Sequence, residues 1–128
     1  MNALKKEVIK YSKKLNITNL SALRSGNISV RAKEKRVEGF YITPSGMKYS
    51  TLKTKDIVFV SLKGIFDKKK TQPSSEWRFH QDIYVNKKEA KAIVHAHSTC
   101  ATAVSSHQKS IPAFHYMVAV AGGEDLKC

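Results

Sequence analysis

Residues 25–46 read SGNISVRAKEKRVEGFYITPSG and carry the pattern that decides the fold. Apolar and polar residues alternate through Ile28, Val30 and Ala32, which is typical of a strand. A second strand is predicted over residues 39–43, and the Pro-Ser-Gly turn sequence that follows ends it. The segment therefore predicts two strands, each bordered by turn residues.

The rest of the chain predicts helices and further strands around this pair. An apolar stripe at helical spacing predicts a helix over residues 4–15, and a second stripe runs from Glu76 to Tyr84, with Ser74 or Ser75 as its N-cap. Strands are expected over 56–62, over 64–67 as a hairpin partner and over 92–96 as a short buried strand, and a helix over 99–106. Because strands and helices do not alternate strictly, we expect a mixed sheet flanked by helices.

Length and composition fit one globular domain spanning residues 1–128. The chain contains 41% hydrophobic and 26% charged residues, and its apolar runs are too short to cross a membrane. The first ten residues lack the apolar core of a secretory signal, and the chain has only two cysteines, so a disulfide framework is not expected. These features predict a soluble cytoplasmic domain.

The formal net charge of +13 raises the question of nucleic-acid binding. Of the 23 basic residues, however, 19 are lysines spread along the chain, whereas phosphate and base recognition favours arginine. A solvated lysine-rich surface is therefore favoured over a nucleic-acid site. The charge is also expected to help attract an anionic substrate.

The sharpest local motif is His95-Ala96-His97, within AIVHAHST. On a strand, residues i and i+2 lie on one face about 6.5–7 Å apart, so the two imidazoles can converge on one metal. Zinc accepts such a pair but needs a third protein ligand. Two histidines brought together without a metal are the alternative.

Residues 73–80, PSSEWRFH, place hydroxyl groups and a carboxylate at a predicted helix N-terminus. Ser74 and Ser75 there suit an anion such as phosphate, and Glu76 can act as a general base near a metal. The alternative is an ordinary helix start in which Glu76 interacts with the helix dipole. The turns at 25–27 and 43–46 have weaker phosphate-binding character.

Five segments in order, SGNISVR, ITPSGMKY, PSSEWRFH, IVHAHS and SIPAFHYMVAVAGG, resemble the class II aldolase/adducin family. The resemblance runs from about residue 4 to the last residue and is strongest to the fuculose-phosphate aldolase branch. It implies a three-layer α/β/α fold with a largely antiparallel sheet. It also implies a metal-dependent carbon–carbon lyase with one Zn²⁺ per subunit, assembled as a homotetramer with active sites at subunit boundaries.

The resemblance implies a role for each matching residue. His95 and His97 match two of the family's three zinc ligands, and Glu76 matches the carboxylate that takes and returns a proton on the substrate carbon. Without substrate, Glu76 is a further candidate zinc ligand. Tyr116 matches a tyrosine that assists proton transfer at the aldehyde oxygen in a neighbouring subunit's site. The matches to the pocket for the substrate phosphate are Gly26, Asn27, Ser45, Gly46, Ser74 and Ser75.

The implied reaction reversibly cleaves a ketose 1-phosphate, such as L-fuculose 1-phosphate, into dihydroxyacetone phosphate and an aldehyde. Zinc would stabilise the enediolate that forms when Glu76 removes a proton. Sibling ribulose 5-phosphate epimerases carry Asp at this position, and methylthioribulose-phosphate dehydratases share the Glu but differ in the residues that follow. A non-catalytic, adducin-like interaction module is the rival from another class.

One departure from the family concerns the third metal-binding histidine, which lies downstream of the point where this sequence ends at Cys128. None of His80, His107 and His115 matches it. We therefore expect residues 1–128 to be the N-terminal portion of the fold. We also expect this chain to bind zinc weakly and to have little lyase activity.

The remaining histidines and Cys100 have simpler predicted roles. His80 lies four residues after Glu76 on the same helical face, so it either supports the site or packs in the core. His107 is expected to be exposed, and His115 to pack or hydrogen-bond locally. Cys100 is predicted to be a buried free thiol.

Overall fold

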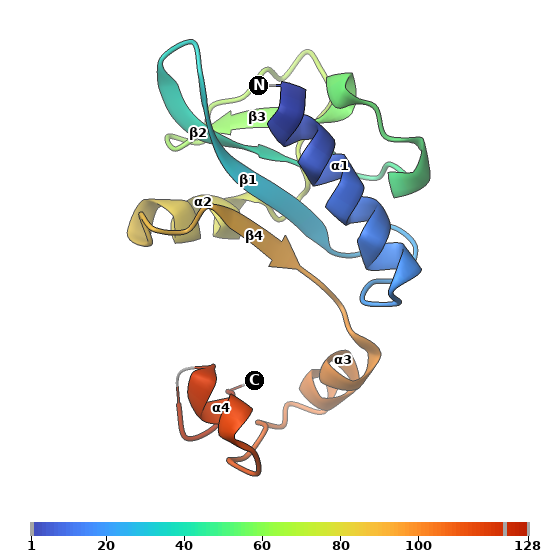
Figure 1. Cartoon of the computed structure of the whole chain (residues 1–128), viewed down its shortest axis with the longest axis vertical. Helices are drawn as coiled ribbons and strands as arrows, with labels where there is room; N and C mark the ends of the chain where they lie inside the picture. Colours follow the sequence, from blue (N-terminus) through green and yellow to red (C-terminus); the bar gives the residue numbers. More distant parts are fainter. Residues whose placement is uncertain (1, 122, 128) are drawn as a thin grey trace. The chain divides into compact units, whose positions relative to one another are not determined.

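The computed structural model describes residues 2–121 and 123–127 (Figure 1). Contacts divide the chain into two compact units, Met1–Ala96 and His97–Cys128. The elements of the first unit are α1 (Asn2–Ile17), β1 (Asn27–Glu34), β2 (Val37–Ile42), 3-10 turns at Tyr49–Thr51 and Thr54–Asp56, β3 (Val58–Ser61), α2 (Trp77–Asn86) and β4 (Ala92–His95). Those of the second unit are α3 (Thr99–Ser106) and α4 (Tyr116–Val120).

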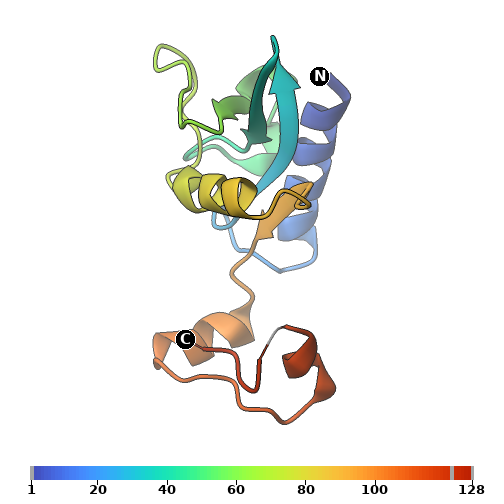
Figure 2. The same cartoon turned by 90° about the vertical axis from the view of Figure 1, so that its left-hand side faces the viewer.

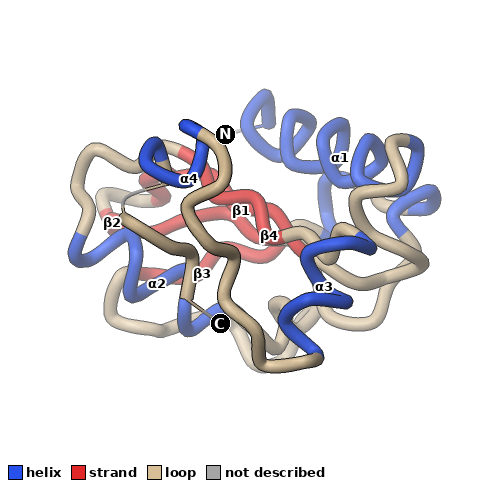
Figure 3. Tube along the Cα trace, turned by 90° about the horizontal axis from the view of Figure 1, so that it is seen from below, coloured by secondary structure: helices blue, strands red, loops and turns tan. Residues whose placement is uncertain are grey.

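The four strands form one sheet in the order β3-β2-β1-β4, and each neighbouring pair is antiparallel. In Figure 3 the strands, drawn in red, lie together between α1 and α2. β1 and β2 are joined by a two-residue turn, Lys35-Arg36, whose φ angles of 46° and 67° are both positive. Such a turn matches the right-handed twist of the strands it connects. The prediction of a largely antiparallel sheet flanked by helices is confirmed.

Helix α1 covers one face of the sheet, and α2 covers the other (Figure 2). The buried α1 side chains Val8 and Leu15 pack in a cluster with Ile28 of β1 and Tyr41 of β2. Because successive strand residues point to opposite faces, Ser29 lies on the α2 side. The predicted helix over 4–15 is confirmed, and it extends two residues further at each end.

The α2 face is built around Tyr84, which is fully buried and packs on Phe40 with ring centroids 5.1 Å apart. Ile42, Val58 and Val60 complete this cluster. Burying an apolar side chain of this size contributes about 1.5–3 kcal/mol. His80, one helical turn before Tyr84, is also fully buried, so α2 brings a polar ring into an apolar layer.

Two predictions about local structure are wrong. Residues 64–67 form no strand: the Ser61 N–H donates to Ile65 O at 3.0 Å, but the Ile65 N–H donates to Ser61 Oγ, so the return bond of a backbone ladder is not made. Neither Ser74 nor Ser75 caps α2: Glu76 is the N-cap, without a side-chain capping bond, and the helix begins at Trp77.

Strand β4 ends at His95 and is half exposed, so the prediction of a buried strand over 92–96 is wrong in its burial. β4 is last in the strand order and pairs with β1 along one edge, which explains its exposure. Helix α3 has its predicted bounds. It buries no residue, and Cys100 is therefore an exposed free thiol instead of a buried one.

In the second unit, a backbone bridge between Ile111 and Leu126 closes the segment that contains α4. His115 Nδ1 accepts a hydrogen bond from the Met117 N–H at 3.3 Å, which confirms the local role expected for this histidine. His107 is exposed, as predicted. In the part of the chain that the structure describes, no helix has both the length and the apolar character of a membrane span.

Candidate metal and proton-transfer site

Glu76, His95 and His97 form the cluster with the clearest chemistry. Glu76 stands at the start of α2 and His95 at the end of β4, and His95 Nε2 lies 3.5 Å from Glu76 Oε2. His97 follows two residues later, and one ligand atom from each of the three lies within 4.8 Å of the others. Two imidazoles and a carboxylate are a donor set that zinc accepts in catalytic sites. These residues therefore fit the metal that the motif predicts.

Asn27 reaches this cluster because strand pairing places it directly opposite His95. Its side chain is only 2% exposed, and its Nδ2 donates to Glu76 Oε2 at 2.5 Å. From the motif alone, Asn27 was expected to line the phosphate pocket. The structure brings it against the candidate base, a contact that depends on the register between β1 and β4.

A line of buried polar groups continues from Asn27 into the α2 face. Asn27 Oδ1 is hydrogen-bonded to His80 Nε2, and His80 Nδ1 lies 2.7 Å from Ser29 Oγ. Ser29 Oγ in turn lies 2.9 Å from Tyr84 Oη. Both ring nitrogens of His80 are thus engaged, so this histidine is a support of the cluster and not a further metal ligand.

Burial sets the protonation of this line. It lowers the pKa of His80 to about 4, with a smaller electrostatic contribution from the neighbouring His95. Burial also raises the pKa of Tyr84 to about 12, against the opposing effects of the Ser29 hydrogen bond and of Arg31. At neutral pH both side chains are therefore uncharged, and each can donate as well as accept.

The segments predicted to bind phosphate lie together in the first unit. A bridge between Pro44 and Pro73 joins two of them, since the Ser45 N–H donates to Gln72 O and the Ser74 N–H donates to Thr43 O, at 3.0 and 2.9 Å. The third segment is joined through Arg24, whose Nη1 donates to Gly46 O at 2.7 Å. Of the predicted residues, Gly26, Asn27 and Ser74 are buried, whereas Ser45, Gly46 and Ser75 are exposed.

Sequence reasoning missed two features of this region. Arg24 was not singled out, although its guanidinium stands beside the predicted phosphate loops. Ser29 and Tyr84 were assigned only to a strand and a helix. The alternation around Ile28 could have identified Ser29, because it places this residue on the face opposite the α1 core.

Tyr116 lies at the first residue of α4, in the second unit, with a side chain that is 71% exposed. Its ring stacks beside that of His115, with centroids 4.4 Å apart. Its role in proton transfer across a subunit boundary stays a prediction.

Gly26, immediately before β1, lies close to His95 of β4, and this contact gives a testable prediction. Its φ is +75°, and a Cβ there would stand 2.6 Å from both His95 O and Ser21 Oγ. Gly46 has a similar φ of +68° but nothing within 4 Å, so it is a matched control. We expect Gly46→Ala to lower the free energy of unfolding in urea by about 1–2 kcal/mol. Gly26→Ala adds a steric clash, so we expect a loss of about 2–5 kcal/mol. Equal losses would contradict the close packing of Gly26.

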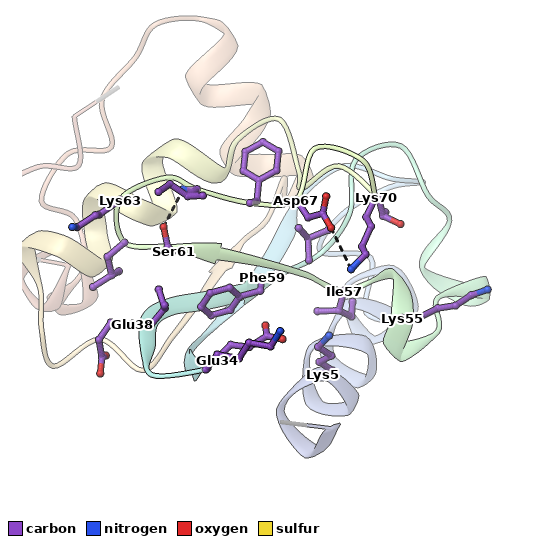
Figure 4. A pocket seen from close by; sticks show the side chains of 17 residues that line it. Lys5, Glu34, Glu38, Lys55, Ile57, Phe59, Ser61, Lys63, Asp67 and Lys70 are labelled. Carbon is purple, nitrogen blue, oxygen red and sulfur yellow. Dashed lines mark hydrogen bonds and ion pairs between the residues drawn. The ribbon is translucent and has the colours of Figure 1, made fainter.

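A cavity of about 1040 Å³ lies along β3, at the edge of the sheet opposite β4 (Figure 4). Its floor is apolar, with Ile57 and Phe59, and lysines such as Lys5, Lys55 and Lys63 stand around it. Glu76, His95 and His97 do not line this cavity. This cavity is therefore separate from the candidate site, which rests on the grouping of ligand atoms.

Comparison with known proteins agrees with the motifs. Residues 6–128 match the family described as "Class II Aldolase and Adducin N-terminal domain". The chain belongs to this family. It is 40% identical over 127 residues to the L-fuculose phosphate aldolase of Escherichia coli K12, which covers 99% of this chain and 57% of that protein.

Two further relatives are similar at the same level. A 5-methylthioribulose-1-phosphate/5-deoxyribulose-1-phosphate aldolase of Rhodospirillum rubrum is 40% identical over 125 residues, covering 98% of this chain and 54% of that protein. A solved structure titled L-fuculose 1-phosphate aldolase superposes with a TM-score of 0.83 at 38% identity, covering 98% of this chain and 57% of the other. The chain thus spans just over half the length of the relatives it matches.

Proposed function

We propose that this chain carries the metal-binding and proton-transfer residues of a zinc-dependent aldolase that acts on a ketose 1-phosphate. The grouping of Glu76 with His95 and His97 carries the proposal. The relatives are named for different sugar phosphates, a fuculose and a 5-methylthioribulose or 5-deoxyribulose phosphate. We therefore propose the class of substrate they share, cleaved to dihydroxyacetone phosphate and an aldehyde, and not one particular sugar.

In this proposal each residue of the cluster has a stated role. His95 and His97 would hold the zinc ion, and Glu76 would be a further ligand while no substrate is bound. A bound zinc ion would act as a Lewis acid toward the charge that develops on the substrate oxygens. Glu76 takes the proton from the carbon next to the carbonyl and returns it in the reverse direction.

The phosphate of the substrate would be held by the converging loops of the first unit. Backbone and hydroxyl donors there would bind it through Gly26, Asn27, Ser45, Gly46, Ser74 and Ser75. Such binding far from the reacting carbon supplies energy that orients the reaction centre. Tyr116, contributed by a neighbouring subunit of a homotetramer, would assist at the aldehyde oxygen.

Exchange of the dihydroxyacetone phosphate C–H proton with deuterated water tests the proposal. This half-reaction needs only the base, the metal and the phosphate grip, so we expect it to be measurable by NMR even where full cleavage is slow. We expect exchange to depend on added zinc and to stop when a chelator removes it. Exchange that continues unchanged without zinc would contradict the proposal.

A further inference from the structure

Three buried polar side chains on the α2 face, those of Ser29, His80 and Tyr84, have no task in the reaction as proposed, and hydrogen bonds join them to Asn27. Asn27 is 2% exposed, and Ser29, His80 and Tyr84 are fully buried beside Phe40 and Ile42. Burying polar groups in an apolar layer costs free energy unless they are hydrogen-bonded to one another. Here they form one continuous line that ends at Glu76.

The chemistry of the end group sets the direction of every bond in the line. An ionised carboxylate only accepts hydrogen bonds, so Asn27 must present Nδ2 to Glu76 and Oδ1 to His80. His80 Nε2 must then carry the proton, and Nδ1 accepts from the Ser29 hydroxyl. Ser29 Oγ is left to accept from the Tyr84 hydroxyl. With a neutral His80 ring, only one arrangement of protons satisfies all four contacts.

We infer that His80 is a positioning residue which, held by Ser29 and Tyr84, fixes the Asn27 amide so that its N–H group grips one oxygen of Glu76. This inference rests on the proposed role of Glu76 as the base. If the amide were turned over, Asn27 Oδ1 would face the carboxylate, and two acceptors would repel each other. The line therefore keeps Glu76 beside His95, 3.5 Å away, instead of letting it rotate into solvent.

Neutrality of the His80 ring suits this task. An imidazolium donates at both nitrogens, so Nδ1 could no longer accept from the Ser29 hydroxyl, and the directions of the Ser29 and Tyr84 contacts would have to reverse. The buried surroundings of His80, which is fully enclosed, disfavour that charged form.

The first test starts from the wild-type chain. Nitrogen-15 NMR of the wild-type chain reports which ring nitrogen of His80 is protonated, and we expect the proton on Nε2. In Ser29→Ala, Nδ1 loses its donor, so the population of this tautomer should fall. Ser12→Ala is the matched control, because Ser12 is equally buried, donates to Val8 O within α1 and lies outside the line. It should leave the His80 signals unchanged.

The second test separates positioning from packing. His80→Leu removes the donor to Asn27, whereas the side-chain amide of His80→Gln can replace the Nε2–H group. For dihydroxyacetone phosphate exchange we expect His80→Leu to lower kcat by about 10–100-fold, the range typical of residues that orient a metal site, with KM little changed. His80→Gln should recover much of this loss.

The results distinguish a failure of the positioning role of His80 from a failure of the proposed function. A proton on Nδ1 of His80 in the wild type, or equal losses in His80→Leu and His80→Gln, would overturn the positioning role. If the wild type exchanges no proton at all with zinc present, the proposed function fails. The His80 tautomer and a shift of the Asn27 amide resonances in Glu76→Gln then decide alone whether the line holds the carboxylate.

Discussion

Glu76→Gln is expected to lower the rate of dihydroxyacetone phosphate proton exchange by about 10²–10⁴-fold, the contribution of a well-placed general base. The amide keeps the size of the side chain and can still contact Asn27, but it cannot accept a proton from carbon. Removal of a proton from carbon is slow without a base held next to the activating group, so a large effect is expected. The measurement is deuterium incorporation at saturating zinc.

Glu89→Gln is the control for this variant. Glu89 is an exposed carboxylate between α2 and β4, so its neutralisation changes net charge equally without touching the cluster. Its exchange rate should match that of the wild type. If Glu76→Gln retains wild-type exchange, Glu76 is not the base.

His95→Ala is expected to lower zinc affinity by more than about 100-fold, since residues that only orient the ligands already account for about 10–100-fold. A zinc ion that binds the folded chain stabilises it, by about 2.7 kcal/mol when present at 100 times its Kd. We expect this zinc-dependent rise in the free energy of unfolding to disappear in His95→Ala. Denaturation with and without zinc, and competition with a chelator, measure both quantities.

His107→Ala provides the comparison, because His107 is an exposed histidine at the end of α3. It should bind zinc as the wild type does. Similar losses in both variants would mean that zinc binds histidines at the surface without a specific site. Unchanged affinity in His95→Ala would rule out the His95-His97 pair as the metal site.

Local sequence pattern was sufficient for most of the elements of the fold. The alternation at Ile28, Val30 and Ala32 predicted β1, and the helical stripes predicted α1 and α2. It failed where a side chain competes with the backbone, as Ser61 does for the Ile65 N–H. The local pattern also wrongly predicted a buried Cys100, because the apolar character of α3 does not say whether another segment packs against the helix.

The candidate site was predictable as a set of residues but not as a set of contacts. The His-x-His motif and Glu76 were identified from the sequence, and the structure groups them. The contact of Asn27 with Glu76 depends on the pairing of Asn27 with His95, between strands far apart in the chain. No local pattern specifies that register, so the line through His80 to Tyr84 could not be foreseen.

The pairing of β1 with β4 has a consequence for where harmful substitutions can fall. A slip of one position would exchange the faces of Ile28 and Ser29, putting an aliphatic group beside the His80 ring and a hydroxyl beneath α1. The apolar contacts between α1 and β1 therefore help to fix the register that positions the candidate zinc ligands. We therefore expect substitutions that weaken the packing of Val8 or Leu15 to lower zinc affinity first, although neither residue belongs to the candidate metal site.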